Sequence, residues 1–204
     1  GEQAHHSDAL ARQRGLDDPG KTEAWYMLKV REGASIRCGA RPGVTAGDVH
    51  NALMGGTIRS LMQPYEVSPD DAFLLYAGTM HYSAGGVLFY EIMQNSDVYI
   101  GLADPPDSAL PSAEREARVA RLMEGLHLEP GYECKTTPVV LERGAYRRSY
   151  IFACTYFALE RLDLREPITL TMDGERFDVL SLIEGEMTVE GGARVEHLRS
   201  GQSC

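Results

Sequence analysis

Short apolar stretches separated by tight turns recur along most of the chain, and this pattern predicts a mainly β protein. The first expected strand, TEAWYMLKV, is rich in aromatic and apolar residues, and REGASIRCGARPG then supplies a turn and a second strand. Three more short strands are expected in VSPDDAFLLYAGTMHYSAGGVLFYEIMQNS, separated by the turns PDD, AGT and AGG. From Tyr150 onward, further short strands are expected in YFALERLDL and in ITLTMDGERFDVLSLIEGEMTVEGG, with a hairpin turn at MDGE.

Helical patterns interrupt these strands in a few places. The segment DALARQRG has a helical composition and is expected to end at Gly15. A second helical stretch is expected to begin at Thr45, a suitable N-cap, and to break at the glycine pair that follows HNALM. The segment SAEREARVARLMEGL predicts an amphipathic helix with Ser112 as its N-cap and Gly125 as its stop.

Many short strands with few helices are typical of a jelly roll of the cupin kind, a double-stranded β-helix with short helical insertions. Because strand-rich stretches lie on both sides of the amphipathic helix, we expect two such units in a bicupin-like arrangement. The first would span residues 1–148 and the second residues 149–204. The chain opens on GEQAHHSD and stops at RSGQSC, which suggests a piece of a longer sequence.

The composition narrows the classes of partner. The formal net charge is -10, with 30 acidic against 20 basic residues, and no basic stripe is present, so nucleic acid is not an expected partner. No apolar run is long enough for a membrane span, and the N-terminus has no signal-peptide pattern. The four cysteines lie far apart without a CxxC pair, which favours reduced thiols in a cytoplasmic protein. The oligomeric state cannot be predicted from these features.

The motif QAHH near the start is the first candidate for chemistry. Gln3 and His5 lie two positions apart, so on a strand both side chains project from the same face, and His6 points away. A carboxamide oxygen and a neutral imidazole are both ligands for a borderline cation. Two such groups alone are equally consistent with a polar strand end.

A second candidate is GKTEAW, which introduces the first expected strand. Lys21 and Glu23 share a face if this segment is extended. One interpretation is an exposed ion pair of little energetic value. The other places Glu23 on a metal, with Lys21 beside it as a proton carrier or as an anchor for an anionic substrate.

The third candidate combines His81, which follows the AGT turn, with Glu91 at the far end of the next strand. In a jelly roll, such strand ends converge at one mouth of the barrel. A set with two imidazoles, one carboxylate and one amide would then form there, with an open position for water or substrate: Gln3, His5, Glu23 and His81. These nitrogen and oxygen ligands suit zinc, and also Fe, Mn, Co or Ni.

At these residues the chain resembles the type I mannose-6-phosphate isomerases, a zinc-dependent cupin family. QAHHSDALARQRG…GKTEAWYML is similar to the QVHPDD…GKTEAWY segment of that family, and YAGTMHYSAGGVLFYEIMQNSD is similar to PAGTxHAxGxGVLLxEIQQNSD. CTYFALERLDL also resembles CPYFxVExL, which opens the family's C-terminal cupin half. The match runs through most of the chain in the same order.

The resemblance assigns functions to the candidate residues. It makes Gln3, His5, Glu23 and His81 the four zinc ligands, and it places Lys21 and Glu91 where the family carries out proton transfer and contacts the substrate. It implies a metal-dependent aldose–ketose isomerase that acts on a sugar phosphate. A proton would move between C1 and C2 through a cis-enediol.

The sequence departs from the family after QNSD. The family continues there with a basic residue thought to be catalytic, whereas this chain has VYIGLADPPD, so that Gly101 stands in place of an arginine and Asp107 in place of a later basic residue. Losing a cation and gaining a carboxylate works against holding a phosphate or an enediolate. Two alternatives therefore stay open: a metal-binding cupin that acts on another sugar or small molecule, and a sugar-binding cupin without turnover.

Overall fold

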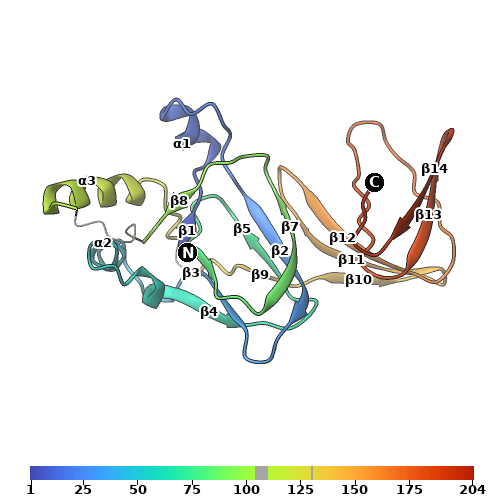
Figure 1. Cartoon of the computed structure of the whole chain (residues 1–204), viewed down its shortest axis with the longest axis horizontal. Coiled ribbons are helices and arrows are strands. Elements are labelled where there is room, and N and C mark those ends of the chain that lie inside the picture. Colours follow the sequence, from blue (N-terminus) through green and yellow to red (C-terminus); the bar gives the residue numbers. More distant parts are fainter. Residues whose placement is uncertain (104–109, 130) are drawn as a thin grey trace. The chain divides into compact units, whose positions relative to one another are not determined.

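The computed structural model describes residues 1–103, 110–129 and 131–204, and it divides the chain into two compact units, Gly1–Arg165 and Glu166–Cys204 (Figure 1). The predicted domain boundary after residue 148 falls inside strand β11 (Tyr146–Ala153) of the first unit. The division into two cupin domains, residues 1–148 and 149–204, stays a prediction. No helix within the described residues is long and apolar enough to cross a membrane.

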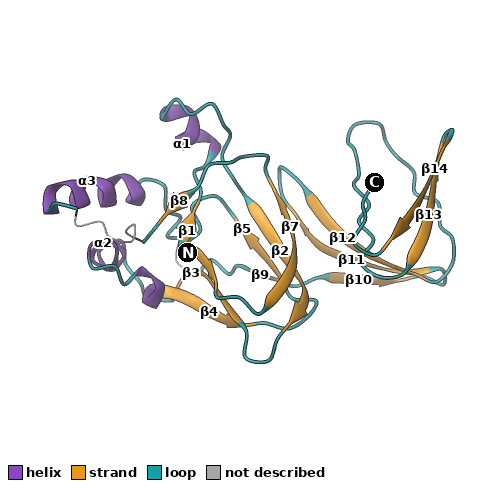
Figure 2. Ribbon diagram, viewed as in Figure 1, coloured by secondary structure: helices purple, strands orange, loops and turns teal. Residues whose placement is uncertain are grey.

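Two antiparallel sheets form the centre of the first unit (Figure 2). The five-stranded sheet has the order β4 (Met62–Glu66), β3 (Ser35–Ala40), β6 (His81–Ser83), β1 (Gln3–Ala4) and β8 (Ile100–Gly101). The four-stranded sheet has the order β7 (Val87–Met93), β2 (Glu23–Val30), β5 (Ala72–Leu75) and β9 (Lys135–Thr136). Neighbours such as β1 and β6 are far apart in the sequence, so the sheets depend on long-range pairing.

Strand β2 shows why its sequence is apolar almost throughout. Alternate side chains leave a strand on opposite faces. Trp25 and Met27 pack with residues of β3 and β5 in a core between the two sheets, whereas Tyr26 packs on the other face against Ile151 of β11. Because both faces of β2 are covered, this strand carries few polar positions, and Glu23 at its start is an exception that requires an explanation.

Three helices lie in the described part of the first unit, and the two longer ones form a second core with residues of the five-stranded sheet. The three helices are α1 (Asp8–Gln13), α2 (Ala46–Met54) and α3 (Ser112–Met123), with a 3₁₀ turn at Ile58–Leu61. Thr45 caps α2 in a capping box with Asp48, as predicted, and Gly15 follows the C-cap of α1 with a φ of 65°. The prediction for Ser112 is wrong, because Pro111 is the N-cap of α3 and Ser112 is already helical.

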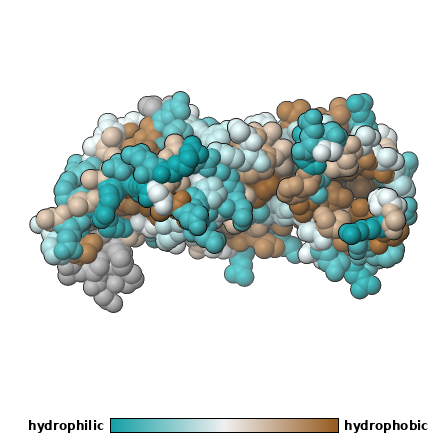
Figure 3. All heavy atoms as spheres, turned by 90° about the horizontal axis from the view of Figure 1, so that it is seen from above, coloured by the Kyte–Doolittle hydropathy of each residue, from teal (hydrophilic) through white to brown (hydrophobic). Residues whose placement is uncertain are grey.

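The C-terminal part contains less regular structure than the pattern predicts. β10 (Val139–Glu142), β11 and β12 (Ala158–Leu164) form a three-stranded sheet in the first unit, and β13 (Glu186–Gly191) pairs with β14 (Arg194–Arg199) in the second. The expected strands on either side of MDGE are absent, and Phe177 in this stretch is 84% exposed. Apolar side chains gather visibly on the surface of the second unit (Figure 3). Without a surface to cover it, alternation alone does not form a strand.

The predicted class, mainly β with short helical insertions, is confirmed. The bicupin arrangement stays a prediction.

Candidate metal centre

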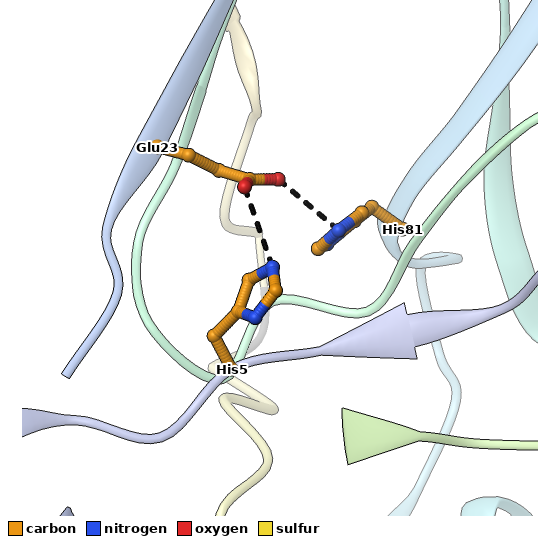
Figure 4. Close-up of side chains that lie close together, drawn as sticks. All are labelled: His5, Glu23 and His81. Carbon is orange, nitrogen blue, oxygen red and sulfur yellow. Dashed lines mark ion pairs between the residues drawn. The ribbon is translucent and has the colours of Figure 1, made fainter. Parts of the chain in front are cut away.

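Three buried side chains meet between the two sheets: His5, Glu23 and His81 (Figure 4). His5 follows β1, His81 begins the adjacent strand β6, and Glu23 begins β2 in the facing sheet. Their exposed fractions are 3%, 1% and 1%, and their ligand atoms all lie within 4.8 Å of one another. The structure therefore brings together three of the residues that the sequence predicts as metal ligands.

Each imidazole of this cluster faces two oxygen atoms. Nδ1 of His5 lies 2.9 Å from the carbonyl oxygen of Val98, and its Nε2 lies 3.3 Å from Oε2 of Glu23. Nδ1 of His81 lies 2.9 Å from the carbonyl oxygen of Thr79, and its Nε2 lies 3.1 Å from Oε1 of Glu23. A neutral imidazole carries one N–H, so in either tautomer one ring nitrogen directs a lone pair at an oxygen.

The short contacts to the carbonyl groups decide which nitrogen lacks a proton. A carbonyl oxygen only accepts hydrogen bonds, so Nδ1 of each ring is the donor, and both Nε2 atoms present lone pairs to the carboxylate. Accordingly, Nε2 of His5, Nε2 of His81 and Oε1 of Glu23 have no hydrogen-bond partner in the described part of the chain, although all are buried. Three converging electron-pair donors without a positive charge between them are unfavourable, and a cation at their centre removes the conflict.

The protonation states support a metal rather than extra protons. Burial lowers the pKa of His81 to about 4, so its ring is neutral at pH 7. Burial acts to raise the pKa of Glu23, but the polar side chains around it, with the Lys21 ammonium group among them, outweigh burial, and the pKa lies below its usual value. The cluster thus combines a carboxylate, the neutral imidazole of His81 and a second imidazole from His5, which is the ligand chemistry of zinc and related divalent ions.

The distances also fit such an ion. Two ligand atoms on a tetrahedral zinc, each about 2.1 Å from the metal, lie about 3.4 Å apart. The observed separations of 3.1 Å and 3.3 Å between nitrogen and oxygen are close to this value. Metal-binding histidines commonly donate their other N–H to a backbone carbonyl, as His5 and His81 do here.

Gln3 lies beside this cluster. In the antiparallel pairing of β1 and β6, Gln3 is directly opposite His81, so the two side chains share a face of the sheet. The register therefore places the amide next to a ligand histidine, as expected for a fourth ligand. Its participation in metal binding stays a prediction.

The two residues predicted to be catalytic flank Glu23. Nζ of Lys21 lies 3.9 Å from Oε2 of Glu23, and the Lys21 side chain is 16% exposed. Glu91 accepts a hydrogen bond of 3.0 Å from Nε1 of Trp25. Although Glu91 as a residue is exposed, partial burial of its carboxyl group and the charge of Glu23 raise its pKa. Both residues thus lie at the metal cluster, and their catalytic roles stay predictions.

Trp25 and the two carbonyl groups are supporting parts of the site that the sequence did not reveal. The ring of Trp25 meets His81 edge to face at 5.4 Å and stacks on Phe89 at 4.9 Å, so it fixes a ligand and Glu91 together. Its position two residues after Glu23 on the same strand face was the available signal. The carbonyl groups of Thr79 and Val98 leave no signal in the sequence, because every residue has one.

Gly101 lies next to Gln3 on the side away from His81. A Cβ atom at Gly101 would lie 3.4 Å from the ring of Tyr99, so the tyrosine occupies the space that a side chain would enter. Position 101, directly opposite Gln3 in the sheet, therefore carries no cationic side chain. Asp107, the other departure from the family, lies outside the described residues.

A buried His/Glu/His cluster between two antiparallel sheets gives this mainly β protein a candidate metal centre. No protein-family model matches the sequence. The mannose-6-phosphate isomerase ManA of Bacillus subtilis (strain 168) is 28% identical over 207 residues, covering 98% of this chain and 62% of the relative. A mannose-6-phosphate isomerase of Streptococcus mutans is 22% identical over 199 residues, covering 98% and 61%.

Solved structures show the same fold. The crystal structure of the Bacillus subtilis mannose 6-phosphate isomerase has a TM-score of 0.80 at 22% identity, covering 99% of this chain and 63% of its own. A zinc-bound mannose 6-phosphate isomerase has a TM-score of 0.65 at 15% identity, covering 99% and 69%. The chain is a homologue of the mannose-6-phosphate isomerase family and spans about three-fifths of the length of these curated relatives.

Proposed function

We propose that the chain carries a metal-dependent aldose–ketose isomerase centre of the mannose-6-phosphate isomerase type. It would interconvert an aldose phosphate and a ketose phosphate by moving a proton between C1 and C2 through a cis-enediol. The proposed metal is zinc, with Gln3, His5, Glu23 and His81 as ligands, and Fe, Mn, Co and Ni suit the same nitrogen and oxygen donors. Bound there, the metal would supply Lewis-acid polarisation of the sugar oxygens.

The observation that carries this proposal is the set of unpartnered electron pairs at the cluster. Two Nε2 atoms and a carboxylate oxygen converge in a buried space without a hydrogen bond among them. A dication binds the lone pairs of both imidazoles and of the carboxylate at once. Without it, the two Nε2 lone pairs and the carboxylate oxygen have no partner in the cluster. The similarity to proteins named mannose-6-phosphate isomerases adds the reaction class.

We assign Glu91 as the base and Lys21 as the residue that neutralises developing negative charge. The raised pKa of Glu91 brings its basicity closer to neutral pH, which favours proton transfer, and the hydrogen bond from Trp25 positions its carboxyl group. Lys21 is held beside the cluster by Glu23, where an ammonium group stabilises an oxyanion of the enediol.

One observation favours a second function. Gly101 lies directly opposite Gln3 and has no side chain. An arginine at this position could bind a phosphate through two hydrogen bonds, and the glycine cannot. A sugar-binding protein that retains the metal without turnover is the alternative consistent with this difference.

Metal content and turnover of matched variants test the proposal. Purified wild-type chain and the His50→Ala control are expected to hold about one zinc each, because the exposed side chain of His50 pairs with Glu116 and is not one of the proposed ligands. The His81→Ala variant is expected to lose the metal and the interconversion of mannose 6-phosphate and fructose 6-phosphate. Metal in wild type without exchange of the C2 proton into deuterated water would support the sugar-binding alternative. Equal metal content in all three proteins would contradict the ligand assignment.

A further inference from the structure

Gly101, Gln3 and His81 form a row across the five-stranded sheet. Gln3 is directly opposite His81 on one side and Gly101 on the other. Opposite residues of antiparallel strands project from the same face, so position 101 faces the side of the sheet that holds the metal cluster. With neighbouring strands about 4.8 Å apart, position 101 lies about 10 Å from position 81 along the row. This separation is comparable with the length of a six-carbon sugar.

The ring of Tyr99 covers the glycine at the end of this row. A Cβ atom at Gly101 would lie 3.4 Å from both Cε1 and the hydroxyl oxygen of Tyr99 and 3.7 Å from its Cζ. Tyr99 is nevertheless 60% exposed. One edge of the ring therefore rests over bare backbone, while most of the side chain is open to solvent on the face that carries the cluster.

The segment that bears Tyr99 is held in place at both ends. The carbonyl group of Val98 accepts the hydrogen bond from the His5 ring, which fixes the preceding residue against the cluster. Arg118 of α3 donates hydrogen bonds of 2.9 Å to the carbonyl groups of Gly101 and Ala103, which fixes the residues that follow. An aromatic ring on an anchored segment loses little conformational entropy when it contacts a ligand.

We propose that Tyr99 forms an aromatic subsite that takes the apolar C–H face of the sugar whose oxygens reach the metal cluster. The inference rests on the proposed function of that cluster. Tyr99, Gly101 and Gln3 are all uncharged, and the guanidinium group of the nearby Arg118 donates to the carbonyl groups of Gly101 and Ala103. This end of the row therefore presents an aromatic ring to the carbon skeleton of the sugar rather than a charged side chain to a phosphate group. Aromatic rings offer a large rigid apolar area, which suits a sugar face without hydroxyl groups. Tyr99 therefore contributes to the affinity for the sugar and does not affect metal binding.

Sugar binding to zinc-loaded protein tests this subsite. The Tyr99→Ala variant is expected to bind mannose and mannose 6-phosphate each about tenfold more weakly, because it loses the ring contact in both cases. The Tyr99→Phe variant keeps the ring and is expected to bind like wild type. Tyr150→Ala is the matched control, because Tyr150 is an exposed tyrosine on β11 that stacks under Arg148. Zinc content is expected to be unchanged in all variants.

The readouts separate the subsite from the proposed function. In the isomerase assay, Tyr99→Ala is expected to raise KM about tenfold with a smaller change in kcat. Equal affinities of wild type and Tyr99→Ala for both sugars would overturn the subsite while the isomerase stands. A loss confined to mannose 6-phosphate and shared by Tyr99→Phe would also overturn it, because it would assign the contact to the hydroxyl and the phosphate. Zinc-loaded wild type that binds neither sugar would overturn both proposals.

Discussion

The replacement Glu23→Gln is expected to have opposite effects on stability with and without metal. In the metal-free protein the Glu23 carboxylate oxygens lie 3.1 Å and 3.3 Å from the Nε2 atoms of His81 and His5, whose lone pairs face them. Glu23 is only 1% exposed, so water does not relieve this contact. The amide group of glutamine has N–H donors that satisfy such a lone pair. A buried hydrogen bond contributes about 1 kcal/mol, so Glu23→Gln is expected to raise the free energy of unfolding by about that amount in chelator.

In zinc, wild type is expected to be more stable than Glu23→Gln, the reverse of the order expected in chelator. A ligand present at 100 times its dissociation constant stabilises the native state by about 2.7 kcal/mol. Wild type gains this energy, whereas Glu23→Gln lacks the anionic ligand and gains little. Urea unfolding in chelator and in excess zinc measures both effects, and the two stability curves are expected to exchange order between the conditions.

The matched control is Glu116→Gln. Glu116 pairs with His50 at 2.8 Å on the surface, so it repeats the same pair of residue types without burial. Its free energy of unfolding is expected to change by less than about 0.5 kcal/mol in either condition. If zinc stabilises Glu23→Gln as much as wild type, or if the variant is the less stable protein in chelator, the argument from opposed lone pairs is refuted.

Two further predictions concern acid and the turn before His81. Because the pKa of His81 lies at about 4 in the folded chain and near 6.5 when unfolded, the unfolded state binds the extra proton first. Urea unfolding of the metal-free protein is expected to show stability falling by about 3 kcal/mol from pH 6.5 to pH 4; His50→Ala should retain this fall, and a flat profile would contradict the buried neutral ring. Gly78 has a φ of 88°, and a Cβ there would lie 2.5 Å from the carbonyl oxygen of Gly125. Gly78→Ala is therefore expected to cost several kcal/mol more than Gly85→Ala, which has a similar φ but open space, in the same assay; equal losses would mean that the contact relaxes.

The local pattern of the sequence was sufficient for much of this protein. Short apolar stretches between turns predicted the mainly β class, and Thr45 and Gly15 marked helix ends correctly, because caps and turns depend on a few adjacent residues. The alternation of side chains in an extended segment placed Lys21 and Glu23 on one face, and their charged groups lie 3.9 Å apart. The family resemblance then identified the histidines that the structure brings to Glu23.

Local pattern was not sufficient where packing decides. The alternating residues around MDGE do not form strands, because an amphipathic stretch needs a surface against which to bury its apolar face, and the second unit leaves Phe177 exposed. Ser112 has the hydroxyl group that suits an N-cap, yet it is the first residue inside α3, and Pro111 is the N-cap. In both cases several structures satisfy the same local preferences.

The metal cluster shows the same division. The sequence by itself determined which ligand types are present and which of them share a strand face, since both follow from residue identity and a period of two. Only the tertiary structure decided that β6 lies beside β1, that β2 faces them, and that the carbonyl groups of Thr79 and Val98 orient the two imidazoles. Pairing between distant strands depends on the free energy of the whole fold, so a local pattern does not predict it. Backbone carbonyl groups are identical at every position, so the sequence does not show which of them orient the imidazoles.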